Sequence, residues 1–433
     1  MIRYYHCTFK QKSPMRLSNG EHTNTDDDLL CDLQGYPFVP GSALTGLLRE
    51  MLNKADADCL FGCLTSEDKE SRVLVSDAVL PPTRTRENIH ISRRDGVAIS
   101  DRGTAVPTAK YDFEVVETGL SYTAVLEWHG QKDSNDDKLL SSLMQQIKGS
   151  GLSVGARTTR GYGRMDVEKI TCTSFDLDSP DALTEWLDYD PFDPSFDPST
   201  ELHYAKCVPV DCSDLDIDYN NRYKIEVGIA MSGSFSVREK STTPLNPLEN
   251  GFRKEPDSRP LKNAAGNPVV PGTSWSGVFK HHINELALAL NLSEEERAAV
   301  LAAFGSSKHK SPLDFNETEI TGGSDRIVTR NALDRFTQAP RMQGGLFCSE
   351  VSCGGESVLT INLIPYNPEN ANDLLLCRLL LLCLKDMHLG LLSVGGEGSI
   401  GRGKVTITAL RINGQDQMAL ISSLEDKLKE VAQ

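Results

Sequence analysis

The sequence has no run of about 18 apolar residues, the length that a helix needs to cross a bilayer, so we expect no membrane-spanning helix. Its longest apolar stretch, Leu374 to Leu384, is interrupted by Arg378 and is typical of a buried helix. The segment from Met1 to Lys12 lacks the apolar core of a secretion signal. These absences predict a cytoplasmic protein that does not engage a membrane.

Cysteine spacings typical of metal sites are also missing. The 11 cysteines include three close pairs, none with CxxC spacing and none with histidines at finger spacing: Cys59/Cys63, Cys207/Cys212 and Cys348/Cys353. An odd number of cysteines in a long chain argues against a disulfide scaffold. We expect free thiols, and a zinc site assembled across the fold is the less favoured alternative.

Positive charge is scarce, because 45 Lys and Arg face 61 Asp and Glu and the net charge is −16. Nucleic-acid binding needs cations near phosphates, so this balance excludes a uniformly basic RNA-binding surface. The acidic residues gather between Asp176 and Asp218, in a stretch rich in Asp, Pro and Ser. A local basic groove elsewhere in the chain therefore remains compatible with the overall charge.

Four segments occur twice, in the same order. The offset between matched positions grows slowly along the chain, from 219 for Tyr4 and Tyr223, to 231 for Pro40 and Pro271, to 240 for Leu152 and Leu392. The third match pairs ISRRDGVAISDRGTAVP with VTRNALDRFTQAPRMQG. Ordered matches of this kind indicate a duplicated domain with modest insertions. We predict a first domain over 1–172, an acidic linker over 173–219 with one short helix, and a second domain over 220–433 that ends in a helix.

Each repeat is predicted to contain a strand, a long loop, a helix, further strands, a second helix and a last strand. The first helices follow VPGS and VPGT, which makes Ser42 and Thr273 candidate N-caps. The first loop has about thirty residues, a length that is usually functional or disordered. This order predicts an α+β protein made of two tandem ferredoxin-like domains, the plan of RNA-recognition modules, with long inserted loops.

The last loop of each repeat combines glycines with basic residues, as GARTTRGYGR and GGEGSIGRGK. Glycine permits positive φ and close backbone approach, so N–H groups can face a phosphate, and arginine can contact a phosphate through two hydrogen bonds. A tight helix-to-strand turn is the alternative explanation. Because LSVG and G-x-G-[R/K] recur at matching places, we favour phosphate binding.

The segments VPGSALTGLLRE, RRDGVAISDRGTAVPTAKYDFEVV and GARTTRGYGRM together resemble the repeat-associated mysterious protein (RAMP) superfamily. In particular they are similar to the backbone subunit of type III CRISPR effector complexes, and two fused units resemble the double subunit of type III-D systems. The resemblance covers roughly Met1–Ile170 and Asn220–Asn413. It implies a metal-dependent endoribonuclease in an antiviral complex, with guide RNA, complementary target RNA and other type III subunits as partners.

In this family the helix start and the glycine-rich loop bind the guide backbone, and a thumb-like hairpin kinks the guide–target duplex at regular intervals. We therefore predict RNA contacts by Ser42, Arg49, Arg93, Arg94, Arg157, Arg160, Arg164, Thr273, Lys280, Arg330, Arg402 and Lys404. Candidate wedges in the two middle segments are Val97, Ile99, Val106, Phe336 and Met342.

The resemblance also implies a cleaving aspartate in the first long loop. Asp26 lies 14 residues before Pro40, and Asp257 lies 14 residues before Pro271. We predict that each binds Mg²⁺ or another divalent cation and cuts the target RNA, with Asp27 as the fallback in the first repeat. A solvated acidic run and a surface turn are the structural alternatives for these two aspartates.

The sequence departs from the family pattern in two places. Thr45 and Ser276 stand where the family usually has lysine, so guide binding there is expected to rest on Arg49 and Lys280. Glu397 occupies the position of Arg157, which predicts a weaker RNA grip in the second repeat.

Two other functions compete with this interpretation. One is a non-catalytic guide-RNA scaffold. The other is a metal-independent endonuclease that processes the guide with a histidine such as His6, His22 or His90.

Overall fold

The computed structural model describes residues 1–63, 70–85, 88–99, 105–193, 201–211, 221–239, 256–306, 309–340 and 346–421. Backbone contacts divide the chain into two compact units. Unit 1 comprises Met1–Arg93, Asp112–Thr158 and Tyr162–Asp218, and unit 2 comprises Arg94–Tyr111, Thr159–Gly161 and Tyr219–Gln433. Two short segments of the first sequence repeat therefore belong to unit 2.

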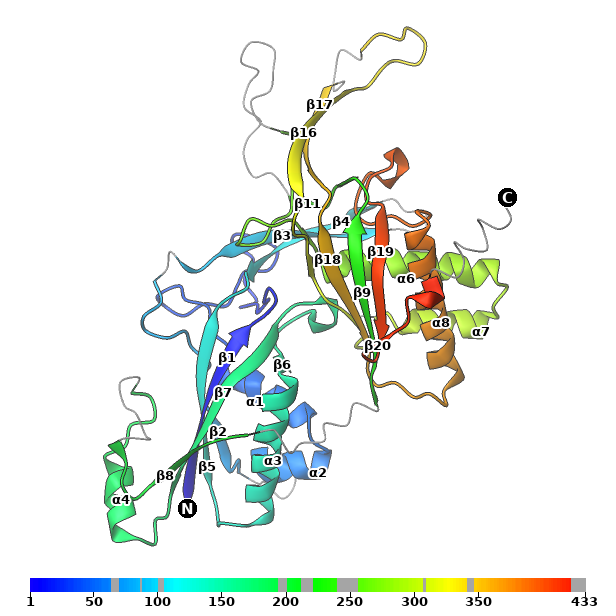
Figure 1. Ribbon diagram of the computed structural model, residues 1–433. Helices are drawn as coiled ribbons and strands as arrows, with labels where there is room; N and C mark the ends of the chain where they lie inside the picture. The colour runs from blue at the N-terminus through cyan, green and yellow to red at the C-terminus, as the bar shows by residue number, and fades with distance from the viewer. Residues whose placement is uncertain are drawn as a thin grey trace. The chain divides into compact units, whose positions relative to one another are not determined.

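Unit 1 is built on an antiparallel sheet with strand order β2-β5-β1-β7-β6, and β8 pairs with β7. Its strands are β1 (Ile2–Gln11), β2 (Val73–Val75), β5 (Ser121–His129), β6 (Leu152–Ser153), β7 (Arg164–Phe175) and β8 (Lys206–Pro209). Side chains alternate along β1, so Tyr5, Cys7 and Phe9 point to one face. That face is covered by α1 (Gly41–Glu50), α2 (Lys54–Phe61) and α3 (Asn135–Ser150), whose apolar residues share its core (Figure 1).

The acidic segment covers one end of the opposite face of this sheet. Ile2 and Tyr4 of β1 pack with Phe175 and Tyr189 in a separate apolar cluster. The covering residues come from the acidic segment, which contains α4 (Pro180–Leu187) as well as β8. The indole N–H of Trp186 donates to the hydroxyl of Tyr4 at 3.0 Å. The end of this face around Ile2 and Tyr4 is therefore buried, whereas His6, Thr8 and Lys10 further along β1 are half-buried.

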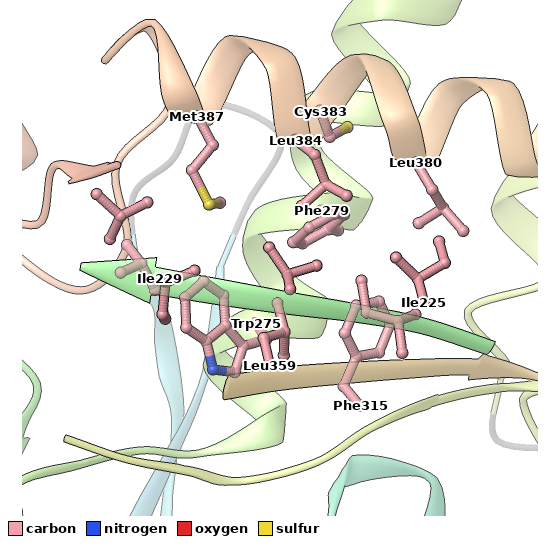
Figure 2. Packing of buried hydrophobic residues seen from close by; sticks show 14 of the residues in the cluster. Ile225, Ile229, Trp275, Phe279, Phe315, Leu359, Leu380, Cys383, Leu384 and Met387 are labelled. Carbon is pink, nitrogen blue, oxygen red and sulfur yellow. The ribbon is translucent and has the colours of Figure 1, made fainter. Parts of the chain in front are cut away.

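Unit 2 has the same plan, with strand order β14-β18-β9-β19-β20. Its strands are β9 (Tyr223–Met231), β14 (Leu313–Phe315), β18 (Glu356–Leu363), β19 (Val405–Ile412) and β20 (Gln415–Asp416). The helices α6 (Gly272–Ala289), α7 (Glu294–Ala302) and α8 (Ala371–His388) cover one face. Figure 2 shows Met387, Leu384 and Leu380 pointing from α8 toward β9, and Trp275 and Phe279 of α6 belong to the same core cluster.

Each repeat also has a hairpin. The strands β3 (Ile91–Ile99) and β4 (Ala105–Val116) pair with each other, and β16 (Ser324–Asn331) and β17 (Leu346–Cys353) form a sheet with β10 (Ser234–Phe235). The β16–β17 hairpin projects beyond the central sheet of unit 2 (Figure 1). Shorter elements are β11 (Arg238–Glu239), β12 (Arg259–Pro260), β13 (Val269–Val270), β15 (Thr318–Glu319) and the 3-10 turns Thr158–Arg160 and Gly398–Ile400.

The predicted α+β class and the duplicated ferredoxin-like plan are confirmed. In both units the first strand is central. In unit 1, β1 lies between β5 and β7, and in unit 2, β9 lies between β18 and β19. Both first strands run antiparallel to both neighbours. The matched sequence segments therefore fold into matched topologies.

Some local predictions were wrong. Ser42 and Thr273 are not N-caps, because Pro40 and Pro271 occupy that position and neither helix has a side-chain cap. In unit 1 the backbone N–H of Gly41 instead donates to the Asp77 carboxylate at 2.7 Å. The basic middle segments contain the strands β3 and β16. The predicted C-terminal helix falls beyond residue 421 and lies outside the described residues. The same holds for Met342 and for the side chain of Ile99, two of the candidate wedges.

Candidate nucleic-acid interface

Asp26 and Asp257 are held by equivalent hydrogen bonds. In unit 1 the backbone N–H of Asp112 donates to the Asp26 carboxylate at 2.9 Å. In unit 2 the backbone N–H of Cys348 donates to the Asp257 carboxylate at 3.0 Å. Asp112 and Cys348 both lie on the second strand of their hairpins, β4 and β17. The equal sequence spacing therefore corresponds to equivalent positions, each beside the second strand of a hairpin.

The three consecutive aspartates of unit 1 have different environments. Asp28 is buried and accepts hydrogen bonds from the backbone of Thr23 at 2.8 Å and of Thr25 at 2.8 Å, so it stabilises the loop. Asp27 is bound by Arg16 and Ser18. Burial opposes ionisation of Asp27, but the hydrogen bonds from Ser18 and Arg16 outweigh it and lower the pKa of Asp27.

Asp26, by contrast, is exposed. Its carboxylate is positioned by the Asp112 N–H, and it lies beside His22, whose Nδ1 contacts the Asp26 backbone carbonyl. Among the three aspartates, Asp26 is thus the one whose carboxylate is both fixed in place and accessible to a substrate.

The glycine-rich loops are anchored by the same three hydrogen bonds in both units. Each bond joins a loop N–H to a carbonyl of the chain itself. In unit 1 the bonds are Gly163 to Pro14 (2.7 Å), Ala156 to Arg16 (2.9 Å) and Val154 to Gly163 (2.8 Å), and in unit 2 they are Gly403 to Ser234 (2.9 Å), Gly396 to Ser236 (2.7 Å) and Val394 to Gly403 (2.9 Å). The first two bonds in each unit tie the loop to the segment after the first strand, and the third closes the loop on itself, so these N–H groups do not face a phosphate.

Glycine is required by this packing. A Cβ on Gly163 would lie 1.7 Å from the carbonyl oxygen of Val154, and one on Gly403 would lie 2.0 Å from that of Val394. Both residues also have positive φ, +73° and +74°. The repeated glycines are therefore needed to close the loop. Any contact with RNA would be made by the side chains of the loop.

Arg157 and Glu397 occupy the same position in the two loops, since both are left-handed, with φ of 61° and 65°. In unit 1 the guanidinium of Arg157 lies 5.0 Å from the centre of the Phe113 ring, and that of Arg16 lies 4.3 Å from the same ring. Tyr162 packs against this ring edge to face. Cation–π contacts thus hold the basic loop of unit 1.

Unit 2 uses charge at the same position. Glu397 pairs with Arg238 at 2.7 Å and also with Arg330 and Arg402. Burial raises the pKa of Glu397, but the hydrogen bond from Arg330 and the neighbouring positive charges outweigh burial and lower it. One carboxylate thus gathers three guanidinium groups, and the cluster keeps a net positive charge. Glu397 does not simply subtract a cation from this loop.

Three predicted RNA contacts are engaged inside their units. Arg49 binds the Gly62 carbonyl at 2.7 Å and the Asp58 carboxylate at 2.6 Å, which links α1 to α2. Arg94 forms an ion pair with Glu317 in which the two side chains are 2% and 9% exposed. Arg160 donates to the buried Ser276 hydroxyl and to the Phe304 carbonyl at 2.6 Å. The family's lysine position is therefore filled in unit 2 by a serine bound to arginine.

The other predicted contacts, apart from Arg402, remain at least partly at the surface. The exposed residues are Ser42, Arg164, Lys280 and Lys404, and the half-buried ones are Arg157, Thr273 and Arg330. Arg93 is half-buried and pairs with Asp112. Arg402 is only 5% exposed, so its guanidinium acts through the Glu397 cluster.

At the open end of the second hairpin, Phe336 is 91% exposed. The Asp334 carboxylate orders this tip by accepting hydrogen bonds from the backbone of Phe336 at 3.0 Å and of Thr337 at 2.9 Å. Val97 and Val106 of the first hairpin are also exposed. An ordered turn that presents an aromatic ring to solvent fits insertion between bases better than a place in the core.

Metal ligands are sparse. No group of three or more His, Cys, Asp or Glu side chains is placed to hold a metal ion among the described residues. Mg²⁺ usually keeps several waters and binds through one or two carboxylates plus substrate phosphates. Asp26 is exposed, whereas Asp257 is half-buried with one carboxylate oxygen buried. One carboxylate in each unit fits that mode when RNA supplies the remaining ligands, and it does not fit a site made of protein ligands alone.

Sequence reasoning missed Asp112 and Arg238. Both act through partners distant in the chain, Asp26 and Glu397, so no local pattern marks them. Asp112 opens a segment predicted as a strand, and its carboxylate reads there as an ordinary strand-end residue.

The fold and these loops define a protein of two ferredoxin-like domains, each with a glycine-rich basic loop and an aspartate beside a hairpin. Residues 8–166 and 226–406 match the RAMP superfamily, one match for each repeat. These matches cover most of the chain, and the protein belongs to the RAMP superfamily.

A chain in the cryo-EM structure of the Type III-B Cmr-beta bound to cognate target RNA is similar to this protein at 16% identity, with a TM-score of 0.32. The similarity covers 39% of this chain and 60% of that one, which is less than two thirds of the relative's length. No curated protein matches the sequence. Within the described residues, every helix is too short or too polar to cross a membrane.

Replacing Glu397 with glutamine should destabilise unit 2 by about 1–3 kcal/mol, because the buried Arg402 loses its charged partner. A carboxylate with a lowered folded-state pKa stabilises the protein above its unfolded pKa, and this contribution is lost as the pH falls through the folded pKa. The gap in unfolding free energy between wild type and Glu397→Gln should therefore be constant from pH 7 to pH 6 and narrow below the ordinary glutamate pKa of 4.5.

Urea unfolding at each pH measures this gap. Glu294→Gln is the control, because Glu294 also pairs with an arginine but its side chain is 86% exposed, so its loss should cost well under about 1 kcal/mol. Equal losses for the two variants at pH 7 would contradict a central role for Glu397.

Proposed function

We propose that this protein is a guide-RNA-binding backbone subunit of a type III CRISPR interference complex, and that it cleaves complementary target RNA through Asp26 and Asp257. The observation that carries the proposal is the matched pair of aspartates, each held by an N–H of the second hairpin strand. Membership of the RAMP superfamily supports an RNA-associated role. The chain would act with guide RNA, target RNA and further type III subunits.

The chemistry proposed is attack of a target 2′-hydroxyl on the adjacent phosphorus. A P–O bond forms to O2′, the P–O5′ bond breaks, and a 2′,3′-cyclic phosphate and a 5′-hydroxyl end result. Each aspartate would orient the 2′-hydroxyl and receive its proton, directly or through a water, while water protonates the leaving O5′. A divalent cation such as Mg²⁺, held by the same carboxylate and the RNA phosphate, would supply charge stabilisation.

Guide binding would rest on the exposed side chains of the loops and helix starts. Arg164 and Lys404 follow the last glycine of their loops, Gly163 and Gly403, and are both exposed. Ser42 and Thr273 open the first helices, where backbone N–H groups favour phosphate. Arg49, Arg94 and Arg160 are left out of this surface, because their guanidinium groups bind partners within the protein.

The hairpins would separate target bases next to each aspartate. Phe336, presented at an ordered tip, would be the wedge of the second repeat, and Val97 or Val106 would serve in the first repeat. Since each aspartate lies beside the second strand of a hairpin, distortion of the duplex and cleavage would occur at the same step along the target. The two units would then give two regularly spaced cuts.

The scaffold alternative draws on the lack of a clustered metal site among the described residues. The histidine-based alternative is less favoured for His6. This ring is covered by the acidic segment, where it contacts the Pro191 carbonyl at 3.0 Å and the Tyr189 hydroxyl at 3.2 Å, and burial lowers its pKa. His22 and His90 are exposed and stay open to that mechanism.

The decisive test uses the complex assembled with a guide and an end-labelled complementary RNA. Asp26→Ala should slow one cut and Asp257→Ala a different cut, each by at least about 100-fold, because a positioned acid–base group contributes on that order. The double variant should lose both cuts. Asp27→Asn is the matched control and should keep both, since Asp27 binds Arg16 rather than substrate.

Persistence of both cuts in the double variant would favour the scaffold. Processing of repeat RNA by the isolated chain in EDTA would favour the histidine mechanism. Either result would overturn the proposal.

Guide contacts can be tested by salt dependence. Arg164→Ala and Lys404→Ala should each weaken guide binding and reduce the slope of log K against log salt by about 0.7, the value for one phosphate contact on a single strand. Lys138→Ala, an exposed lysine on α3, is the control and should leave the slope unchanged. Unchanged slopes for both loop variants would show that these loops do not contact the guide.

A further inference from the structure

Two reciprocal hydrogen bonds join Asp26 and Asp112. The Asp112 N–H donates to the Asp26 carboxylate at 2.9 Å, and the Asp26 N–H donates to the Asp112 carboxylate at 3.1 Å. We infer that Asp112 is a positioning residue for Asp26, with Arg93 as the cation that holds the Asp112 carboxylate in place. This inference rests on the proposed cleavage by Asp26 and concerns unit 1 alone.

The setting of Asp112 supports this role. Asp112 is 8% exposed, so its carboxylate is not part of the surface that meets substrate. Arg93 forms an ion pair with it from the neighbouring strand β3. An ionised carboxylate beside a second carboxylate is unfavourable unless a cation compensates it, and Arg93 supplies that charge. The pair Arg93–Asp112 thus fixes the acceptor of the Asp26 N–H.

In unit 2 the two corresponding hydrogen bonds to the aspartate are made by the backbone of Cys348. The Asp257 N–H donates to the backbone carbonyl of Cys348 at 2.6 Å, and the Cys348 N–H donates to the Asp257 carboxylate at 3.0 Å. Cys348 stands where unit 1 has Asp112. The arginine that matches Arg93, Arg330, pairs instead with Glu397. The acceptor of the aspartate N–H is therefore a side-chain carboxylate in unit 1 and a backbone carbonyl in unit 2.

This difference predicts unequal sensitivity. When Asp112 loses its carboxylate, the Asp26 N–H loses its acceptor and Arg93 loses its partner, while the Asp112 N–H still reaches the Asp26 carboxylate. A reacting group displaced by about 1 Å can lose on the order of 100-fold in rate. Cleavage by unit 1 should therefore slow, whereas cleavage by unit 2 in the same complex should not.

The test compares both cuts on one target RNA under single-turnover conditions. Asp112→Ala should slow the Asp26-dependent cut by about 10–100-fold with target affinity unchanged, and the Asp257-dependent cut should stay within about twofold. Asp112→Asn should recover part of the rate, since its amide oxygen still accepts the Asp26 N–H. Asp178→Ala, which removes an exposed carboxylate elsewhere in unit 1, is the control for charge and should change neither cut.

A second readout does not depend on cleavage. Amide hydrogen exchange of the peptide that contains Asp26 should accelerate in Asp112→Ala and recover in Asp112→Asn, because the Asp26 N–H donates to the Asp112 side chain. The peptide that contains Asp257 should exchange at the same rate in all variants.

Three outcomes would overturn the inference. The Asp26-dependent cut could keep its rate in Asp112→Ala, both cuts could slow equally, or asparagine could rescue neither rate nor exchange. The proposed function fails separately, if Asp26→Ala itself leaves that cut in place.

Discussion

The arrangement of both candidate sites depends on one set of hydrogen bonds, which ties the glycine-rich loop to the segment after the first strand. The bonds from Gly163 to Pro14 and from Gly403 to Ser234 close this connection, and a side chain at either glycine would collide with the chain. The same segment leads into the loop that carries the aspartate. Closing the glycine-rich loop thus fixes where the aspartate loop starts, and the hairpin strand fixes where it ends.

On this shared frame the two repeats have diverged in their charges. Unit 1 holds its loop with Arg157 stacked on Phe113 and supports its aspartate with the Asp112 carboxylate. Unit 2 gathers its arginines on Glu397, and its aspartate is bound by the backbone N–H and carbonyl of Cys348. The net charge of −16 is compatible with RNA binding, because acidic residues are concentrated in a segment that covers one end of the outer face of the first sheet. The two repeats therefore share a topology and differ in the side chains that surround the glycine-rich loop and the aspartate.

Much of this could be predicted from the sequence, because duplication makes each repeat a check on the other. The order of matched segments predicts the ferredoxin-like plan, and the equal spacing to Pro40 and Pro271 predicts equivalent aspartates. The fate of single arginines could not be predicted, because Arg94 and Arg160 find their partners, Glu317 and Ser276, more than a hundred residues away. The prediction that Ser42 is an N-cap was wrong because Pro40 occupies the cap position. The N–H of Gly41 donates instead to the carboxylate of Asp77, which lies far along the chain.

The most direct measurement of the central claim is a structure of the assembled complex with guide and a target that carries 2′-deoxy nucleotides at the two cut positions. The account predicts the Asp26 and Asp257 carboxylates within direct or water-bridged hydrogen-bond distance of the two modified C2′ positions, each beside a base displaced by the adjacent hairpin. Both aspartates lying away from the target backbone, with the RNA on another face of the protein, would contradict it.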